Sequence, residues 1–152
     1  MNTELGNKLV AAYPKMFPEG NFYFECGDGW YEILDTLCRR IQAHIDNREE
    51  AIKWAVKSNA RRSNPYGPHE FKVPESVPQV TVAQIKQKFA GLRFYYDGGD
   101  ETIDGMVQMA ESWAYRTCET CGNPGKQVGR SWIYISCDEH IAERDRVKED
   151  EV

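Results

Sequence analysis

Four residues near the C-terminus have the types and spacing of a metal site. Cys118 and Cys121 form one pair, Cys137 and His140 form a second, and fifteen residues separate the two pairs. Two residues between the members of a pair allow a tight turn to direct both side chains at one point, and zinc prefers thiolate and imidazole ligands. We therefore expect one structural Zn²⁺ ion, because four protein ligands leave no coordination position for water or substrate.

The residues around these ligands predict the local fold. Turn residues follow Cys121 at 122–125, the segment 131–136 has the composition of a strand, and the run after Cys137 favours a helix. A knuckle, a hairpin and a ligand pair at the start of a helix follow one another in a treble-clef finger. The competing interpretation is that the thiols are only buried as small apolar groups.

The size and composition are those of one globular domain with a core of its own. The chain has 152 residues, of which 41% are hydrophobic and 12% aromatic. No apolar run approaches the roughly 20 residues of a membrane helix, and the first residues lack the pattern of a signal peptide. Five cysteines, most of them in metal-site spacing, favour a reducing compartment. We expect a cytoplasmic protein.

Hydrophobic periodicity predicts an α+β fold with amphipathic helices packed on a small sheet and a C-terminal treble-clef-like finger. The body at 1–117 and the finger at 118–152 should pack as one unit, because the last body helix leads directly into Cys118. The expected elements, in chain order, are a short helix before Pro14, a strand at 22–26, a helix from Trp30 to about Ala60 capped by Asp28, a proline-rich extended loop at 61–79, a helix at 81–90 stopped by Gly91, a strand at 92–96, and a helix at 101–116 capped by Asp100.

Other candidate chemistry is explained by structural roles. Cys38 and His44 adjoin the apolar stripe of the long helix, so we expect a buried thiol and a hydrogen-bonded structural histidine. Four acidic residues between 97 and 104 have ligand types that suit Mg²⁺ or Ca²⁺, but their spacing matches no EF-hand loop, and helix capping accounts for two of them. They are Asp97, Asp100, Glu101 and Asp104.

Charge and aromatic residues suggest where a partner would bind. Residues 61–96 carry six Lys/Arg against two Asp/Glu, a balance of +4, although the whole chain has a net charge of −5. Interfaces are enriched in Tyr, Trp and Arg. The candidate partner-binding residues are Arg61, Arg62, Tyr66, Arg93, Tyr95 and Trp132.

Three segments resemble a set of small zinc-finger-containing proteins encoded by bacteriophages and prophages. They are FYFECGDGWY at 22–31, IKQKFAGLRFYYDGGD at 85–100, and CETCG followed by WIYISCDEH up to His140. Those relatives typically have two glycines where this chain has Ala90 and Gly91. The resemblance implies the same four zinc ligands and a phage accessory protein acting in the bacterial cytoplasm. It brings no established activity.

Three functions are compatible with these features. The small size, acidic charge and closed zinc site favour a non-enzymatic protein that binds and modulates a host protein. The alternative is nucleic-acid binding by a basic stripe, although the global charge opposes it. An enzyme such as a treble-clef nuclease would need a histidine beside the finger helix, where His140 is already a zinc ligand. The basic stripe would consist of Arg61, Arg62, Lys86, Lys88, Arg93, Lys126 and Arg130.

Overall fold

The computed structural model describes residues 1–61, 70–130 and 132–150 and confirms a mixed α+β fold. The described residues form four α-helices, one short 3₁₀ turn at Asp28–Trp30 and five strands. The helices are α1 (Thr3–Ala12), α2 (Tyr31–Ala60), α3 (Glu101–Ala114) and α4 (Asp138–Asp150); the strands are β1 (Phe24–Glu25), β2 (Thr81–Lys88), β3 (Gly91–Asp97), β4 (Lys126–Val128) and β5 (Tyr134–Ser136).

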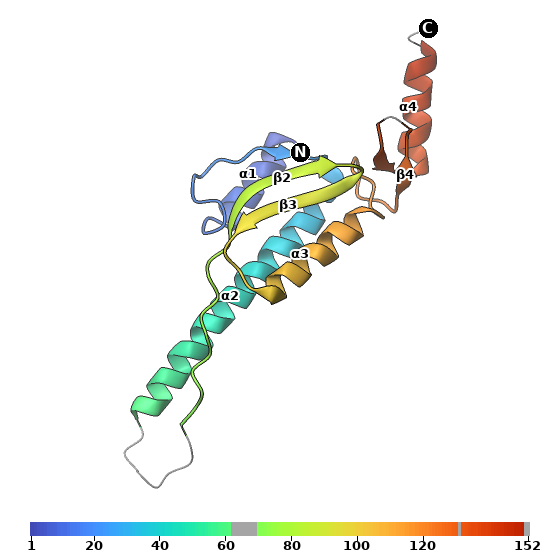
Figure 1. Ribbon diagram of the computed structural model, residues 1–152. Coiled ribbons are helices and arrows are strands. Elements are labelled where there is room, and N and C mark those ends of the chain that lie inside the picture. The colour runs from blue at the N-terminus through green and yellow to red at the C-terminus, as the bar shows by residue number, and fades with distance from the viewer. Residues whose placement is uncertain (62–69, 131, 151–152) are drawn as a thin grey trace.

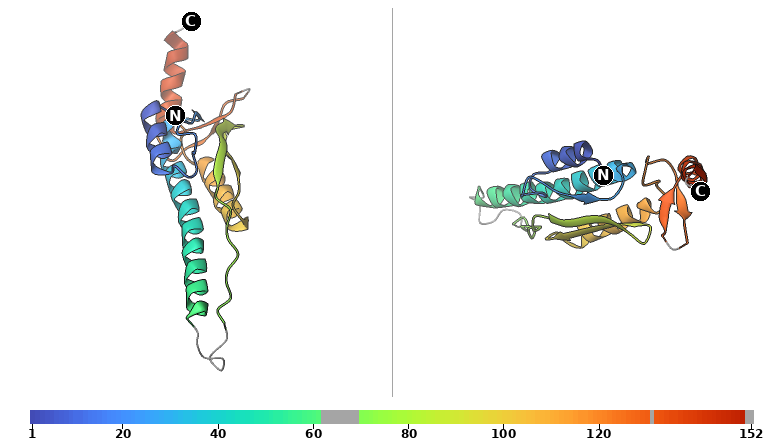
Figure 2. Two further views of the ribbon diagram at one scale, coloured as in Figure 1. Left: turned by 90° about the vertical axis from the view of Figure 1, so that its left-hand side faces the viewer. Right: turned by 90° about the horizontal axis from the view of Figure 1, so that it is seen from above.

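The main sheet lies on two antiparallel helices (Figures 1 and 2). Its strand order is β1-β2-β3. Strand β2 pairs with β1 in parallel and with β3 in antiparallel orientation. His44 in the middle of α2 contacts Asp100 at the start of α3, and Trp30 at the start of α2 contacts Thr117 beyond the end of α3, so the two helices run in opposite directions. Apolar side chains from the sheet and from these helices form one buried core.

The prediction of a helix at 81–90 was wrong, because this segment is strand β2. Val82 and Ile85 are both buried, and their spacing of three residues resembles a helix. A register shift between Val82 and Gln84 inserts an extra residue into the strand. This β-bulge turns Val82 and Ile85 to the same face of the sheet, where they pair with Tyr96 and Phe94. A bulged strand therefore reproduces the apolar spacing of a helix.

Gly91 does not end a helix, as the sequence had suggested, but begins β3 after a two-residue turn. Phe89 and Ala90 form that turn with positive φ angles of 51° and 63°, in a conformation that usually selects asparagine and glycine. A Cβ atom on Gly91 would lie 2.4 Å from the hydroxyl oxygen of Tyr115. A side chain at position 91 would therefore displace the end of the Tyr115 side chain.

The long helix predicted from Trp30 to about Ala60 is confirmed, but its start differs from the prediction. Asp28 does not cap α2; its carboxylate accepts hydrogen bonds from the backbone and the side chain of Asn2, at 2.6 and 2.7 Å. Trp30 occupies the N-cap position, and its side chain makes no capping hydrogen bond. The predicted burial of Cys38 is confirmed, and burial raises the pKa of its thiol to about 12.

The second half of α2 projects beyond the sheet and α3 (Figure 1). Beyond Ile45, only Ala55 of this helix is buried. The extended segment 70–76 returns alongside it: the side chain of Asn59 makes two hydrogen bonds of 2.9 Å with the backbone of Phe71, and Trp54 packs against the Phe71 ring. We call α2 residues 46–60 together with 70–76 the arm. Residues 62–69 of the predicted proline-rich loop lie outside the described part of the chain.

Asp100 caps α3, as predicted. Its carboxylate accepts hydrogen bonds from the backbone N–H of Ile103 at 3.1 Å and from His44 Nε2 at 2.9 Å. Burial would raise the pKa of Asp100, but these hydrogen bonds outweigh it and hold the pKa below its usual range. The unfolded chain therefore binds this proton more readily than the folded chain, so the stabilisation exists above the unfolded pKa and is lost as pH falls through the folded pKa.

We predict that Asp100→Ala lowers the free energy of unfolding by about 1–2 kcal/mol at pH 7, because it removes a helix cap. The loss should shrink as the pH falls below the folded pKa of Asp100, where the wild-type cap is itself protonated. Chemical denaturation at neutral and acidic pH measures both values. The control Asp97→Ala, at an exposed neighbouring carboxylate, should cost less than about 0.5 kcal/mol at either pH. An equal loss at both pH values would contradict the assignment.

Candidate metal centre

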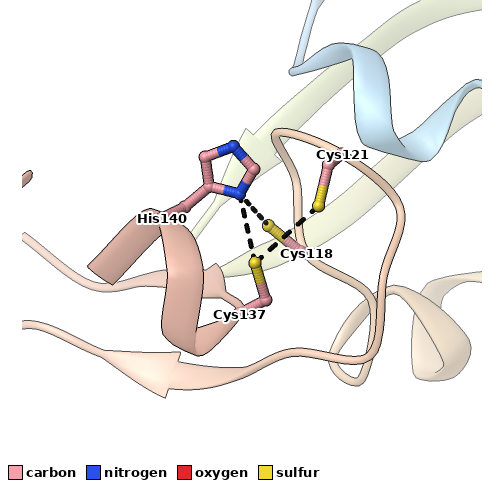
Figure 3. A group of neighbouring side chains, drawn as sticks. All are labelled: Cys118, Cys121, Cys137 and His140. Atoms are coloured by element: carbon pink, nitrogen blue, oxygen red, sulfur yellow. Dashed lines mark hydrogen bonds between the residues drawn. The ribbon is translucent and has the colours of Figure 1, made fainter. Parts of the chain in front are cut away.

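The four predicted ligands lie together in the structure (Figure 3). One ligand atom from each of Cys118, Cys121, Cys137 and His140 can be chosen so that all four lie within 4.8 Å of one another. The sulfurs of Cys121 and Cys137 are 3.8 Å apart, and His140 Nδ1 lies 3.7 Å from the Cys118 sulfur and 3.1 Å from the Cys137 sulfur. Three thiols and one imidazole nitrogen thus surround a single point and are suited to hold a metal ion.

The first ligand pair lies in a tight backbone turn directly after α3. The N–H of Gly122 donates to the carbonyl of Cys118 at 2.9 Å, and the N–H of Cys118 donates to the carbonyl of Asn123 at 2.7 Å. Gly122 has a φ of +80°, a conformation that L side chains rarely adopt. This turn directs the two cysteine side chains to the same point.

The β4–β5 hairpin returns the chain to this point with the second ligand pair. Cys137 follows β5 directly, and His140 lies in the first turn of α4. The N–H of Ile141 donates to the carbonyl of Cys137 at 3.1 Å, so the helical hydrogen bonds begin at the ligand itself. Lys126 forms an ion pair with Asp138 at 2.6 Å across the hairpin and the helix start.

The surroundings of Cys118 favour its thiolate form. Burial opposes ionisation, but hydrogen bonds from the backbone N–H groups of Cys121, Cys137 and Thr120 outweigh it and lower the pKa of Cys118 to about 6. A thiolate is the form that binds a metal. These N–H groups belong to the segments that carry the other two cysteines. Bringing the cysteines together therefore also stabilises the thiolate of Cys118.

The Cys/His cluster is joined to the body by hydrogen bonds that the sequence analysis did not predict. The N–H of Gly29 donates to the carbonyl of Glu119 at 2.8 Å, and the N–H of Gly27 donates to the Glu119 carboxylate at 2.9 Å. The buried Trp30 donates its indole N–H to the carbonyl of Thr117 at 3.0 Å. Burial raises the pKa of Glu119. The turn around Asp28, between α1 and α2, therefore packs directly on the loop that carries Cys118 and Cys121.

Glycine is required where these two backbones meet. A Cβ atom on Gly29 would lie 2.2 Å from the carbonyl oxygen of Cys118 and 2.5 Å from the nitrogen of Gly122, and one on Gly27 would lie 2.2 Å from the carbonyl oxygen of Glu119. The only signal in the sequence was the Gly-Asp-Gly-Trp run itself. The run shows that a close approach is possible, but not which segment approaches.

The predicted partner-binding residues that the structure describes lie on separate elements. Arg61 directly follows the last residue of α2, whose C-terminal end points away from the Cys/His cluster, whereas Trp132 lies between β4 and β5 (Figure 1). Tyr95 is exposed on β3, and Arg93 interacts with Glu111 and the Tyr115 hydroxyl. Arg62 and Tyr66 lie outside the described residues.

Comparison of the chain with protein-family models, with curated proteins and with solved structures finds no match in any of the three. None of the helices in the described ranges combines the length and the apolar character needed to span a membrane.

We predict that removing the metal with a strong chelator, or replacing one ligand in Cys137→Ser, lowers the melting temperature and shifts the tryptophan emission to longer wavelengths. Trp54, Trp113 and Trp132 are already exposed, so the shift would report Trp30, which is completely buried against Thr117. Cys26→Ser, at a buried thiol outside the cluster, should keep the metal content and respond to the chelator as the wild type does. Unchanged melting and emission after chelation would contradict a structural metal.

We predict that Gly29→Ala destabilises the protein by about 1–3 kcal/mol and weakens metal retention, because the added methyl group overlaps the backbone of the ligand loop. The matched control is Gly105→Ala in α3, where an added Cβ meets no atom within 4 Å. In dilute protein that change should stabilise the helix by up to about 1 kcal/mol. Denaturation curves and a competition assay with a chromogenic chelator measure both effects. Equal behaviour of the two variants would refute the required close approach.

Proposed function

We propose that the cluster binds one structural zinc ion in a treble-clef-like finger. Zn–S bonds of about 2.3 Å in a tetrahedron place neighbouring sulfurs about 3.8 Å apart. The distance between the sulfurs of Cys121 and Cys137 is 3.8 Å. Three thiolates and an imidazole are a ligand set that zinc occupies in closed structural sites, and a closed site leaves no position for a substrate.

We further propose that the protein is a non-enzymatic phage accessory protein that binds and modulates a host protein in the bacterial cytoplasm. The observation that carries this proposal is the arm. A helix that buries only one residue in its last fifteen positions contributes little to the core. It nevertheless exposes large apolar side chains, with Trp54 56% and Val56 52% exposed and Phe71 and Val73 also exposed on the returning segment. Exposed apolar groups on a projection typically mark an interaction surface.

The arm is held in place by contacts near its ends. Arg48 donates to the carbonyl of Glu75 at 3.2 Å. The Asn59 side chain forms two hydrogen bonds with the backbone N–H and carbonyl of Phe71. Together with the Trp54–Phe71 contact, these bonds keep the returning segment beside the helix. The aromatic surface is thus preorganised, which lowers the entropic cost of binding a partner.

One observation supports nucleic-acid binding as the second candidate. Lys86 and Arg93 are direct cross-strand neighbours, and the Lys86 ammonium group lies 5.4 Å from the centre of the Tyr95 ring. Two cations beside an aromatic ring suit a single-stranded nucleic acid. Glu25 on β1 is the cross-strand neighbour of Lys86, and the Glu111 carboxylate contacts Arg93. These two acidic residues offset the positive charge of this small surface. We therefore prefer a protein partner.

We predict that the double variant Trp54→Ala/Val56→Ala loses the partner while retaining the fold, because alanine preserves the helix and both side chains are exposed. Full-length protein with its metal would be immobilised and exposed to bacterial cytosol, and the captured proteins compared with those held by wild type. Losing a tryptophan hot spot costs about 2 kcal/mol or more, which is roughly thirtyfold in affinity.

Tyr23→Ala is the control for this experiment, because Tyr23 is exposed on the body and lies outside the arm. It should capture the same protein as wild type. If the arm variant and the control capture the same proteins equally well, the arm is not the binding surface. Capture that disappears after nuclease treatment, with a steep dependence on salt, would replace the proposal by nucleic-acid binding.

A further inference from the structure

A second apolar surface lies between α2 and α3, next to the core residue Leu37. The two helices enclose a groove of about 530 Å³. Ile33 and Leu37 line it from α2, and Met106, Met109, Ala110 and Trp113 line it from α3. Met109 is 72% exposed and Trp113 is 58% exposed, although both lie on the apolar side of α3. Contiguous apolar surface of this kind on a folded body indicates a protein interface.

Gly105 is a second sign that another chain approaches α3. Glycine inside a helix costs roughly 0.5–1 kcal/mol relative to alanine. The close backbone contacts that require glycine at Gly29 are missing at Gly105, where an added Cβ would meet no atom within 4 Å. Gly105 precedes Met109 by four residues, so the two lie on the same side of the helix. A bare backbone beside the groove allows a partner helix to pack closely.

The charges at the two ends of the groove complement each other. Glu32 lies at one end on α2 and Arg40 lies two turns further along, with Thr36 midway between them. All three are exposed, and within the described ranges neither Glu32 nor Arg40 forms an ion pair. On a helix that rises 1.5 Å per residue, the two charges are about 12 Å apart.

A two-fold symmetric contact would satisfy both charges at once. The two-fold axis of such a dimer would lie in the interface plane, perpendicular to the helices and level with Thr36. Rotation about this axis places α2 antiparallel to α2 of the second copy, so that Glu32 faces Arg40 of that copy. By symmetry, the Glu32–Arg40 ion pair then forms twice. The groove is centred between Met106 and Trp113 on α3, so the same axis places Met106 against Trp113 of the second copy. Contacts between a thioether and an aromatic ring are favourable.

We propose that this groove is the interface of a symmetric homodimer, with Met109 and Trp113 in its apolar centre and the two Glu32–Arg40 pairs at its rim. The occupant is a second copy of this chain because the charge pattern complements itself. An axis running along the groove would instead place α2 on α3 of the second copy and leave both charges against apolar side chains. The interface is separate from the arm, so it goes beyond the proposed host-protein binding.

Charge reversal provides the sharpest test. In a homodimer of Glu32→Arg, or of Arg40→Glu, like charges meet at both rim positions. In an equimolar mixture of the two variants, a mixed dimer has opposite charges at both positions. We expect wild type to have the mass of two chains in sedimentation velocity, each single variant to dissociate at least about tenfold more readily, and the mixture to recover the dimer. Full-length protein with its metal would be used throughout.

Two further variants complete the experiment. Met109→Glu places a charge in the centre of the groove at an exposed position, so it should give a folded monomer with unchanged metal content. Tyr23→Glu places the same charge on an exposed residue outside the groove and should remain dimeric. A wild-type protein that remains monomeric at high concentration would overturn the proposal. The groove would then be a binding site for a helix of another protein. A dimer that survives Met109→Glu, or single variants that the mixture does not rescue, would overturn it equally.

Discussion

The close approach of two backbone segments, Gly27–Trp30 and Cys118–Gly122, is the constraint on which the rest of the structure depends. The first segment leads into the long helix α2, and the second follows α3 and carries two of the four candidate metal ligands. Gly29 lies so close to the ligand loop that no side chain fits between them, and the indole of Trp30 is buried beneath Thr117. The starting end of α2 and the final end of α3 are thus fixed at the metal cluster.

This arrangement explains how so small a finger can hold its position. The β4–β5 hairpin has strands of three residues, which contribute little stability by themselves. Binding of structural zinc is worth about 10–16 kcal/mol in finger peptides, which is comparable to the roughly 5–15 kcal/mol that stabilise a whole domain. With the proposed zinc in place, the ligand loop becomes a rigid platform for the body. The two apolar surfaces, on the arm and between α2 and α3, are then presented by helices with a fixed end.

The sequence was most informative where the chemistry of single residues decides the structure. The spacing of the three cysteines and His140 predicted a cluster that the structure brings together, and Asp100 was recognised as a helix cap. Periodicity failed at β2, since a bulge gave Val82 and Ile85 the spacing of a helix, and pairing with β3 outweighed local preference. The hydrogen bonds of Gly27 and Gly29 to Glu119 join residues that are 92 and 90 positions apart in the chain. No local pattern contains that information, and the same holds for the groove between α2 and α3.

We propose that a closed zinc site of three sulfurs and one nitrogen organises this fold. X-ray absorption spectroscopy of the purified protein, combined with elemental analysis, tests it most directly. We expect one zinc per chain, with three sulfur neighbours at about 2.3 Å, one nitrogen at about 2.0 Å and no water in the first shell. Protein that is folded without zinc, or zinc with an oxygen-rich shell, would contradict this account.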